Sequence, residues 1–134
     1  MIIRPSPAVA PARTGTPDPA EWSRQAAELN QPAILQQASF HPGRLPGQSV
    51  FAAFEPTSVL LSALKSAEEK DGLILRAYNC AAAAVQARLA LPHWGREIQA
   101  AFGPFEVKTF KIPFAPDQPI HETNLLEDPL TAIS

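Results

Sequence analysis

The sequence has little of several features that mark common classes of protein. Its one cysteine, Cys80, excludes a disulfide within the chain and a cluster of thiolate metal ligands, and favours a reducing compartment. Lys and Arg number 11 against 13 Asp and Glu, so the net charge of −2 lacks the positive excess that a nucleic-acid surface needs. Apolar runs fall far short of the roughly 20 residues of a membrane span, and prolines interrupt the N-terminal stretch where a signal peptide would be apolar. We therefore expect a cytoplasmic protein with no nucleic-acid partner and no membrane partner.

Motifs that carry chemistry are also missing. The three histidines, His41, His93 and His121, have no second metal ligand at the spacing of a known motif, so we interpret them as surface or rim histidines. The acids of residues 68–71 (EEKD) fall in a predicted turn, where solvated charge explains them better than a catalytic pair. No serine nucleophile elbow, phosphate-binding loop or Cys/His pair occurs. The residues themselves therefore predict no catalytic, cofactor-binding or metal-binding position.

The first part of the chain is rich in proline. Nine of the 15 prolines lie in residues 1–56, and each fixes φ and removes a backbone donor, so regular structure should be sparse there. Residues 1–19 predict a disordered or loosely packed arm, because they hold almost nothing to bury. One short helix is expected over residues 18–29, where Asp18 can cap the first turn and Pro19 fits within it.

From residue 49 onward the sequence predicts short strands. The expected strands cover residues 49–55, 58–67, 73–79, 84–91 and 105–112, and residues 122–127 are expected to form a last short strand or an extended segment. Residues 58–67 would also form a helix face. The Asp71-Gly72 pair that follows favours a hairpin instead, because glycine tolerates positive φ. Short strands separated by Gly and Pro turns predict an all-β fold, an antiparallel β-sandwich over residues 20–134.

Two of these strands carry informative apolar patterns. Residues 84–91 alternate cleanly, and the side chains expected to face inward are Val85, Ala87, Leu89 and Leu91. In residues 105–112 the inward set should begin with Phe105, Val107 and Thr109. The phase then changes at Phe110, which predicts a bulge or a strand covered on both faces.

Four stretches of the chain together resemble a known family. In chain order they are ELNQPAILQQASFHPGRLP (28–46), SVLLSALKSAEEKDGLILRAYN (58–79), FGPFEVKTFKI (102–112) and HETNLLEDPL (121–130). The second has an acidic Asp-Gly hairpin before a strand ending in Arg-x-Tyr-Asn, and the fourth contains Asn-Leu-Leu-Glu. Together they resemble the C-terminal β-domain of bacterial-type family 38 glycoside hydrolases, which are α-mannosidases.

The resemblance implies a domain that packs on a catalytic domain and helps to wall its substrate cleft. The family's retaining hydrolysis uses a carboxylate nucleophile and a divalent metal, usually zinc, held by an N-terminal α/β domain and a helical bundle. No catalytic or metal residue carries over to this sequence, so we expect the chain to be inactive alone. Its expected partner is the catalytic domain of an α-mannosidase, from the same gene or a separate chain, or a second copy of itself.

Three residues are candidate contacts to a sugar or to a partner. Trp94, in the loop LPHWG, could stack on a sugar ring, although a tryptophan in such a loop more often buries one face against the core. Arg76 and Tyr78 end the strand that best matches the family, and a polar strand end at which Asn79 shapes the turn explains them better than contact with a ligand. A stand-alone carbohydrate-binding or protein-interaction module is the alternative function, which a coplanar pair of exposed aromatics on one sheet face would favour.

Overall fold

The computed structural model describes residues 18–31, 33–37, 39, 42–43 and 48–130. Contacts divide the chain into two units, residues 1–42 and 43–134, which are described separately. The prediction of a disordered arm over residues 1–19 falls almost entirely outside the described residues. Among the helices of the described ranges, none is long and apolar enough to cross a membrane.

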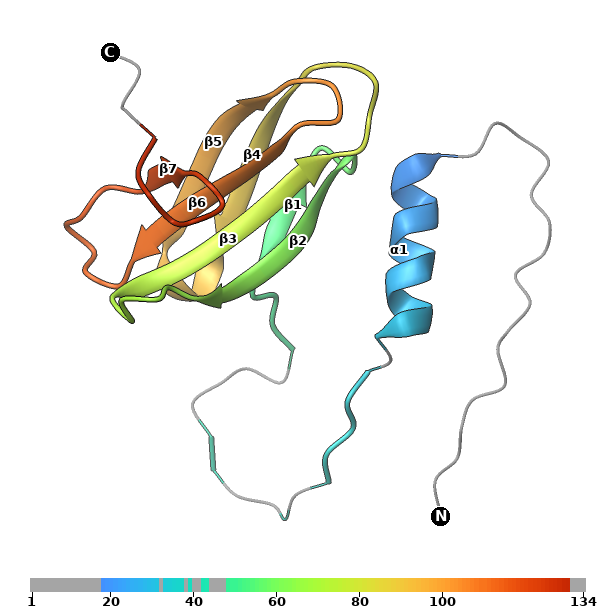
Figure 1. Ribbon diagram of the computed structural model, residues 1–134. Coiled ribbons are helices and arrows are strands. Elements are labelled where there is room, and N and C mark those ends of the chain that lie inside the picture. The colour runs from blue at the N-terminus through green and yellow to red at the C-terminus, as the bar shows by residue number, and fades with distance from the viewer. Residues whose placement is uncertain (1–17, 32, 38, 40–41, 44–47, 131–134) are drawn as a thin grey trace. The chain divides into compact units, whose positions relative to one another are not determined.

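The first unit holds the predicted short helix, α1 (Pro19–Asn30) (Figure 1). Asp18 caps it as expected, because its carboxylate accepts a hydrogen bond from the Ala20 N–H at 3.0 Å. Within the first turns, Glu21 accepts hydrogen bonds from Arg24 at 2.7 Å and Gln25 at 2.8 Å, which supports the helix locally. At the other end the Gln31 N–H donates to the Ala27 carbonyl.

The second unit is the predicted antiparallel β-sandwich. Its strands are β1 (Ala53–Glu55), β2 (Val59–Ser66), β3 (Gly72–Asn79), β4 (Val85–Leu91), β5 (Arg96–Phe102), β6 (Val107–Pro113) and β7 (His121–Thr123). They form a three-stranded sheet in the order β1-β4-β5 and a four-stranded sheet in the order β2-β3-β6-β7. Figure 1 shows the long strands β3 and β6 side by side in front of β4 and β5.

The core lies between the two sheets. Its buried members are Val59, Leu75, Ala77, Ala87, Leu89, Leu91, Ile98, Phe102, Phe110 and Ile112. The inward positions expected for 84–91 are confirmed, since Ala87, Leu89 and Leu91 are buried there and Val85 packs partly against the cluster. Phe102 and Phe110 meet edge to face with ring centroids 6.4 Å apart, joining the two sheets at the centre. Residues 58–67 are a strand rather than a helix, as the hairpin signal predicted.

Strand β6 corrects part of the predicted pattern. Phe105 and Val107 were expected to face the core, yet they are 65% and 52% exposed. Phe105 lies in the turn before the strand, with φ +54°. Its side chain therefore does not follow the in-and-out alternation of the β6 side chains. The alternative of a strand covered on both faces is confirmed, because Thr109 and Phe110 are both buried on opposite faces.

The hairpin over residues 66–73 is present, but glycine is needed there for a reason other than positive φ. The positive φ, +59°, belongs to Lys70. Gly72 instead lies against β6: a Cβ added to it would come within 2.5 Å of the Ile112 carbonyl oxygen. Close approach of two backbones therefore selects glycine at this position.

Strand β5 was not predicted from the sequence. Its residues alternate, with Ile98 and Phe102 buried and Glu97 and Gln99 exposed. The pattern is weak because Ala100 and Ala101 separate the two large apolar residues. The left-handed Gly95 (φ +58°) that precedes β5 is the signal that could have revealed a hairpin with β4.

Candidate functional site

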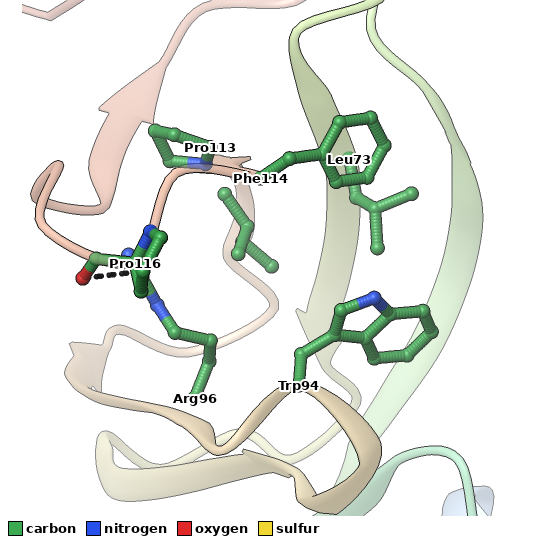
Figure 2. A pocket seen from close by; sticks show the side chains of 7 residues that line it. Leu73, Trp94, Arg96, Pro113, Phe114 and Pro116 are labelled. Atoms are coloured by element: carbon green, nitrogen blue, oxygen red, sulfur yellow. Dashed lines mark hydrogen bonds between the residues drawn. The ribbon is translucent and has the colours of Figure 1, made fainter.

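Trp94 lies at one end of the sandwich, in the short helix η1 (Pro92–Trp94) between β4 and β5. Its indole lines a shallow hollow together with Leu73, Arg96, Ile112, Pro113, Phe114 and Pro116. Figure 2 shows the Leu73 side chain between the rings of Trp94 and Phe114. The hollow measures about 30 Å³, which is room for water but not for a sugar ring.

Arg96 fixes one wall of this hollow. Its guanidinium donates to the Pro116 carbonyl at 3.1 Å (Figure 2). It also donates to the Gln118 carbonyl at 2.7 Å, with a longer contact of 3.4 Å to the Ala115 carbonyl. Backbone carbonyls therefore occupy guanidinium N–H donors that could otherwise bind a carboxylate or phosphate ligand. This role could not be predicted from a local pattern, because Arg96 and the loop it holds are some 20 residues apart in the chain.

The aromatic residues around Trp94 do not form a flat platform. Phe51 stacks on His93 with centroids 4.6 Å apart and an interplanar angle of 32°, and it meets Trp94 at 6.3 Å and 53°. His93 also shares a hydrogen bond between its Nε2 and the Ser49 hydroxyl. Trp94 is 40% exposed, so one part of its ring is buried against the sandwich, as expected of a rim residue. These tilted rings differ from the coplanar pair that would favour a sugar-binding module.

Arg76 and Tyr78 lie away from that end, on the outward face of the four-stranded sheet. Leu75 and Ala77 belong to the core, so the alternate residues of β3 point to the opposite face. Both Arg76 and Tyr78 are half-buried. The Arg76 Nε donates to the Thr109 hydroxyl of the neighbouring strand at 3.2 Å.

Asn79 ends the same strand and organises two turns. Its Nδ2 donates to the carbonyls of Ala83 at 2.8 Å and Gly103 at 2.9 Å, and its Oδ1 accepts from the Ala81 N–H at 3.0 Å. Asn79 is fully buried, so each of these bonds replaces one to water. The adjacent Cys80 is buried too and donates its thiol hydrogen to the Ser58 carbonyl at 3.1 Å. Asn79 therefore shapes the turn, as the sequence suggested.

The segment NLLE that supports the family resemblance forms a compact loop after β7. The Asn124 Oδ1 accepts from the N–H groups of Leu126 at 2.8 Å and Asp128 at 3.0 Å, and its backbone N–H donates to the Asp128 carbonyl at 2.9 Å. These bonds close the loop on itself. The side chains of Leu125 and Leu126 remain 67% and 78% exposed at its tip.

Glu127 fastens this loop to the outward face of the four-stranded sheet. One carboxylate oxygen lies 2.7 Å from the Lys65 ammonium of β2, and the other accepts from the Glu68 N–H at 2.9 Å. The ammonium of Lys65, and then the hydrogen bond from the Glu68 N–H, hold the pKa of the Glu127 carboxyl below its ordinary value. In Figure 1 the loop passes in front of β6 toward the hairpin of β2 and β3.

Two of the acids of residues 68–71 pair with a lysine of the neighbouring strand. Glu69 and Asp71 lie 2.6 Å and 2.9 Å from the Lys111 ammonium of β6. Hydrogen bonding to Lys111 lowers the pKa of Asp71, and the two acids raise the pKa of Lys111. The prediction of simple solvated charge is thus refined, because these carboxylates hold the hairpin tip against the next strand.

The histidines and acids do not gather into a metal site in the part of the chain that the structure describes. There, no three His, Cys, Asp or Glu side chains are grouped closely enough to hold a metal ion. His121 lies on β7 and His93 contacts Ser49, while His41 is outside the described residues.

Comparison with known proteins identifies the family of the sandwich. Residues 58–134 match the profile described as "Glycosyl hydrolases family 38 C-terminal beta sandwich domain". The match begins at β2 and includes the Arg76–Tyr78 face, the Trp94 end and the Asn124 loop. No curated protein and no solved structure matches the chain. The chain therefore belongs to the family 38 glycosyl hydrolases, and carries their C-terminal β-sandwich domain.

Proposed function

We propose that this chain is the C-terminal supporting domain of an α-mannosidase, packed on a separate catalytic domain and helping to wall its substrate cleft. The family match over residues 58–134 is the observation that carries the proposal. The catalytic domain supplies the hydrolysis of α-mannosidic bonds and holds the divalent metal. The chain alone is inactive and works in the cytoplasm.

The polar contacts of the sandwich support a scaffolding role. Side chains that chemistry could use are engaged in holding the fold: Asn79 with three backbone groups, Arg96 with carbonyls, and Glu127 with Lys65 and a backbone N–H. A rigid domain of this kind can hold a neighbouring cleft wall in position.

The test uses two separately purified polypeptides: this chain and the catalytic part of a family 38 α-mannosidase encoded in the same genome. We expect them to form a complex in size-exclusion chromatography. We expect hydrolysis of an aryl α-mannoside by the catalytic part to increase when the chain is added. No association, or turnover by the repurified chain alone with or without zinc, would refute the proposal.

A stand-alone carbohydrate-binding or protein-interaction module is the second candidate. The exposed aromatic end, where Trp94 is 40% and Phe114 is 53% exposed, favours it. The small hollow and the tilted rings argue against a sugar platform. Titration of the chain with mannose and short α-mannosides, followed by tryptophan fluorescence, decides between them, since saturable quenching that Trp94→Ala abolishes would favour the module.

A further inference from the structure

Arg76 stands apart from the other basic side chains on the strands. Elsewhere on the described strands they meet acids or carbonyls: Lys65 meets Glu127, Arg88 meets Glu97, Lys108 meets Glu122, Lys111 meets Glu69 and Asp71, and Arg96 meets backbone carbonyls. Among the described residues, Arg76 makes one side-chain hydrogen bond, to the Thr109 hydroxyl, through one of its five N–H donors. The other N–H donors of Arg76 make no hydrogen bond to a described residue, so they are available to an acceptor on another molecule.

A second polar side chain near Arg76 lacks a hydrogen-bond partner among the described residues. Register places Ala63, Arg76, Thr109 and Thr123 side by side across β2, β3, β6 and β7, on the outward face. Thr109 and Thr123 are each 3% exposed. Within the described residues the Thr123 hydroxyl has no hydrogen-bond partner. Folding of the sandwich alone thus leaves this row incompletely paired.

Apolar groups border the same row. The neighbouring row on the outward face is Leu60, Tyr78 and Val107, and Val107 is 52% exposed. The Asn124 loop, fastened to this face by Glu127, presents Leu125 and Leu126 to solvent. An arginine and a tyrosine bordered by exposed aliphatic side chains have the composition of an interface hot spot.

We infer that the outward face of the four-stranded sheet docks on the catalytic part of the enzyme, and that Arg76 there binds a carboxylate of that partner. This inference rests on the proposed function. Charge complementarity selects the occupant, since a planar guanidinium with free N–H donors matches a carboxylate in two parallel hydrogen bonds. Leu125 and Leu126 meet an apolar surface beside that carboxylate.

The experiment measures the affinity of the full chain for the separately purified catalytic part by calorimetry. Arg76→Gln is expected to weaken binding about 10- to 100-fold, the range for a lost charge-assisted hydrogen bond, and Leu126→Ser about tenfold. The matched control is Arg88→Gln, which removes a charge from the three-stranded sheet and should leave the affinity unchanged. Added salt should weaken wild-type binding more than Arg76→Gln binding.

Hydrogen exchange of the wild-type chain, with and without the catalytic part, supplies a test independent of any variant. We expect added protection in β3 and in residues 124–128, with β5 unchanged. Wild-type binding with unaltered affinity of Arg76→Gln, or protection confined to the β1-β4-β5 sheet, would overturn the inference and leave the proposed function intact. Absence of wild-type binding would overturn both. A dimer of the chain alone that Arg76→Gln dissociates, or protection of the same face by mannose, would assign it to another occupant.

Discussion

The Glu127 carboxylate lies 2.7 Å from the Lys65 ammonium, and this pair joins the loop after β7 to strand β2 at the far edge of the same sheet. The Glu127 side chain is only 10% exposed, whereas Lys65 is 51% exposed. The contact spans β3 and β6 on the outward face. It adds an anchor at β2 for a loop that follows a strand of only three residues. Glu127 also adopts a positive φ of +71°, which turns the chain at this point of the loop.

The pH dependence of stability should report this pair. Because the pKa of Glu127 is lowered in the folded state, its contribution is full above the unfolded value of about 4.3 and is lost as pH falls through the folded pKa. Glu127→Gln should therefore lower the free energy of unfolding at pH 7, and the difference from wild type should shrink below about pH 4. Urea unfolding at several pH values measures it. In a Lys65→Met background the effect of Glu127→Gln at pH 7 should be smaller, and an equal effect would contradict the pairing.

Core truncation should separate two leucines of β3. Leu75 is fully buried in the core, so Leu75→Ala should lower the free energy of unfolding by about 2–5 kcal/mol. Leu73 is only partly buried and borders the small hollow, so Leu73→Ala should cost less. Leu125→Ala, at an exposed position, is the control and should stay within about 0.5 kcal/mol of wild type. Equal losses at Leu73 and Leu75 would contradict the assigned core.

Gly72, the first residue of β3, and Gly95, which precedes β5, should respond differently to substitution. Gly72→Ala should destabilise by about 1–3 kcal/mol, because the new Cβ meets the Ile112 carbonyl. Gly95→Ala meets no atom within 4 Å and should cost about 1–2 kcal/mol through its positive φ. Asn tolerates that conformation, so Gly95→Asn should recover part of the loss and Gly72→Asn should not. Thermal unfolding of the four variants checks both causes.

Asn79→Ala should be among the more damaging polar substitutions. It leaves the Ala83 and Gly103 carbonyls and the Ala81 N–H without their partner, at about 1–3 kcal/mol for each buried group that water does not reach. Gln99→Ala, on the exposed face of β5, should have little effect. The comparison uses urea unfolding and circular dichroism. A loss for Asn79→Ala no greater than for Gln99→Ala would show that the side chain does not hold the two turns.

The sequence by itself determined the fold class and most of the strands. Alternation over residues 84–91 and the Asp71-Gly72 pair are local signals, since strand periodicity and turn preference arise within a few residues. The family could be recognised because contiguous stretches such as 58–79 carry its sequence pattern, which needs no knowledge of how the strands pair. The short helix followed from Asp18 and Pro19, whose capping acts within one turn.

Only the tertiary structure decided which side chains remain available to a partner. The pairing of Lys65 with Glu127, and of Arg96 with Gln118, joins residues remote in the chain, so no local pattern could predict it. The same is true of Arg76, whose lack of an acidic partner among the described residues becomes visible only once the neighbouring strands are placed. Register also decided that Gly72 serves close approach to β6, because a contact between strands depends on how they pair and not on either strand alone.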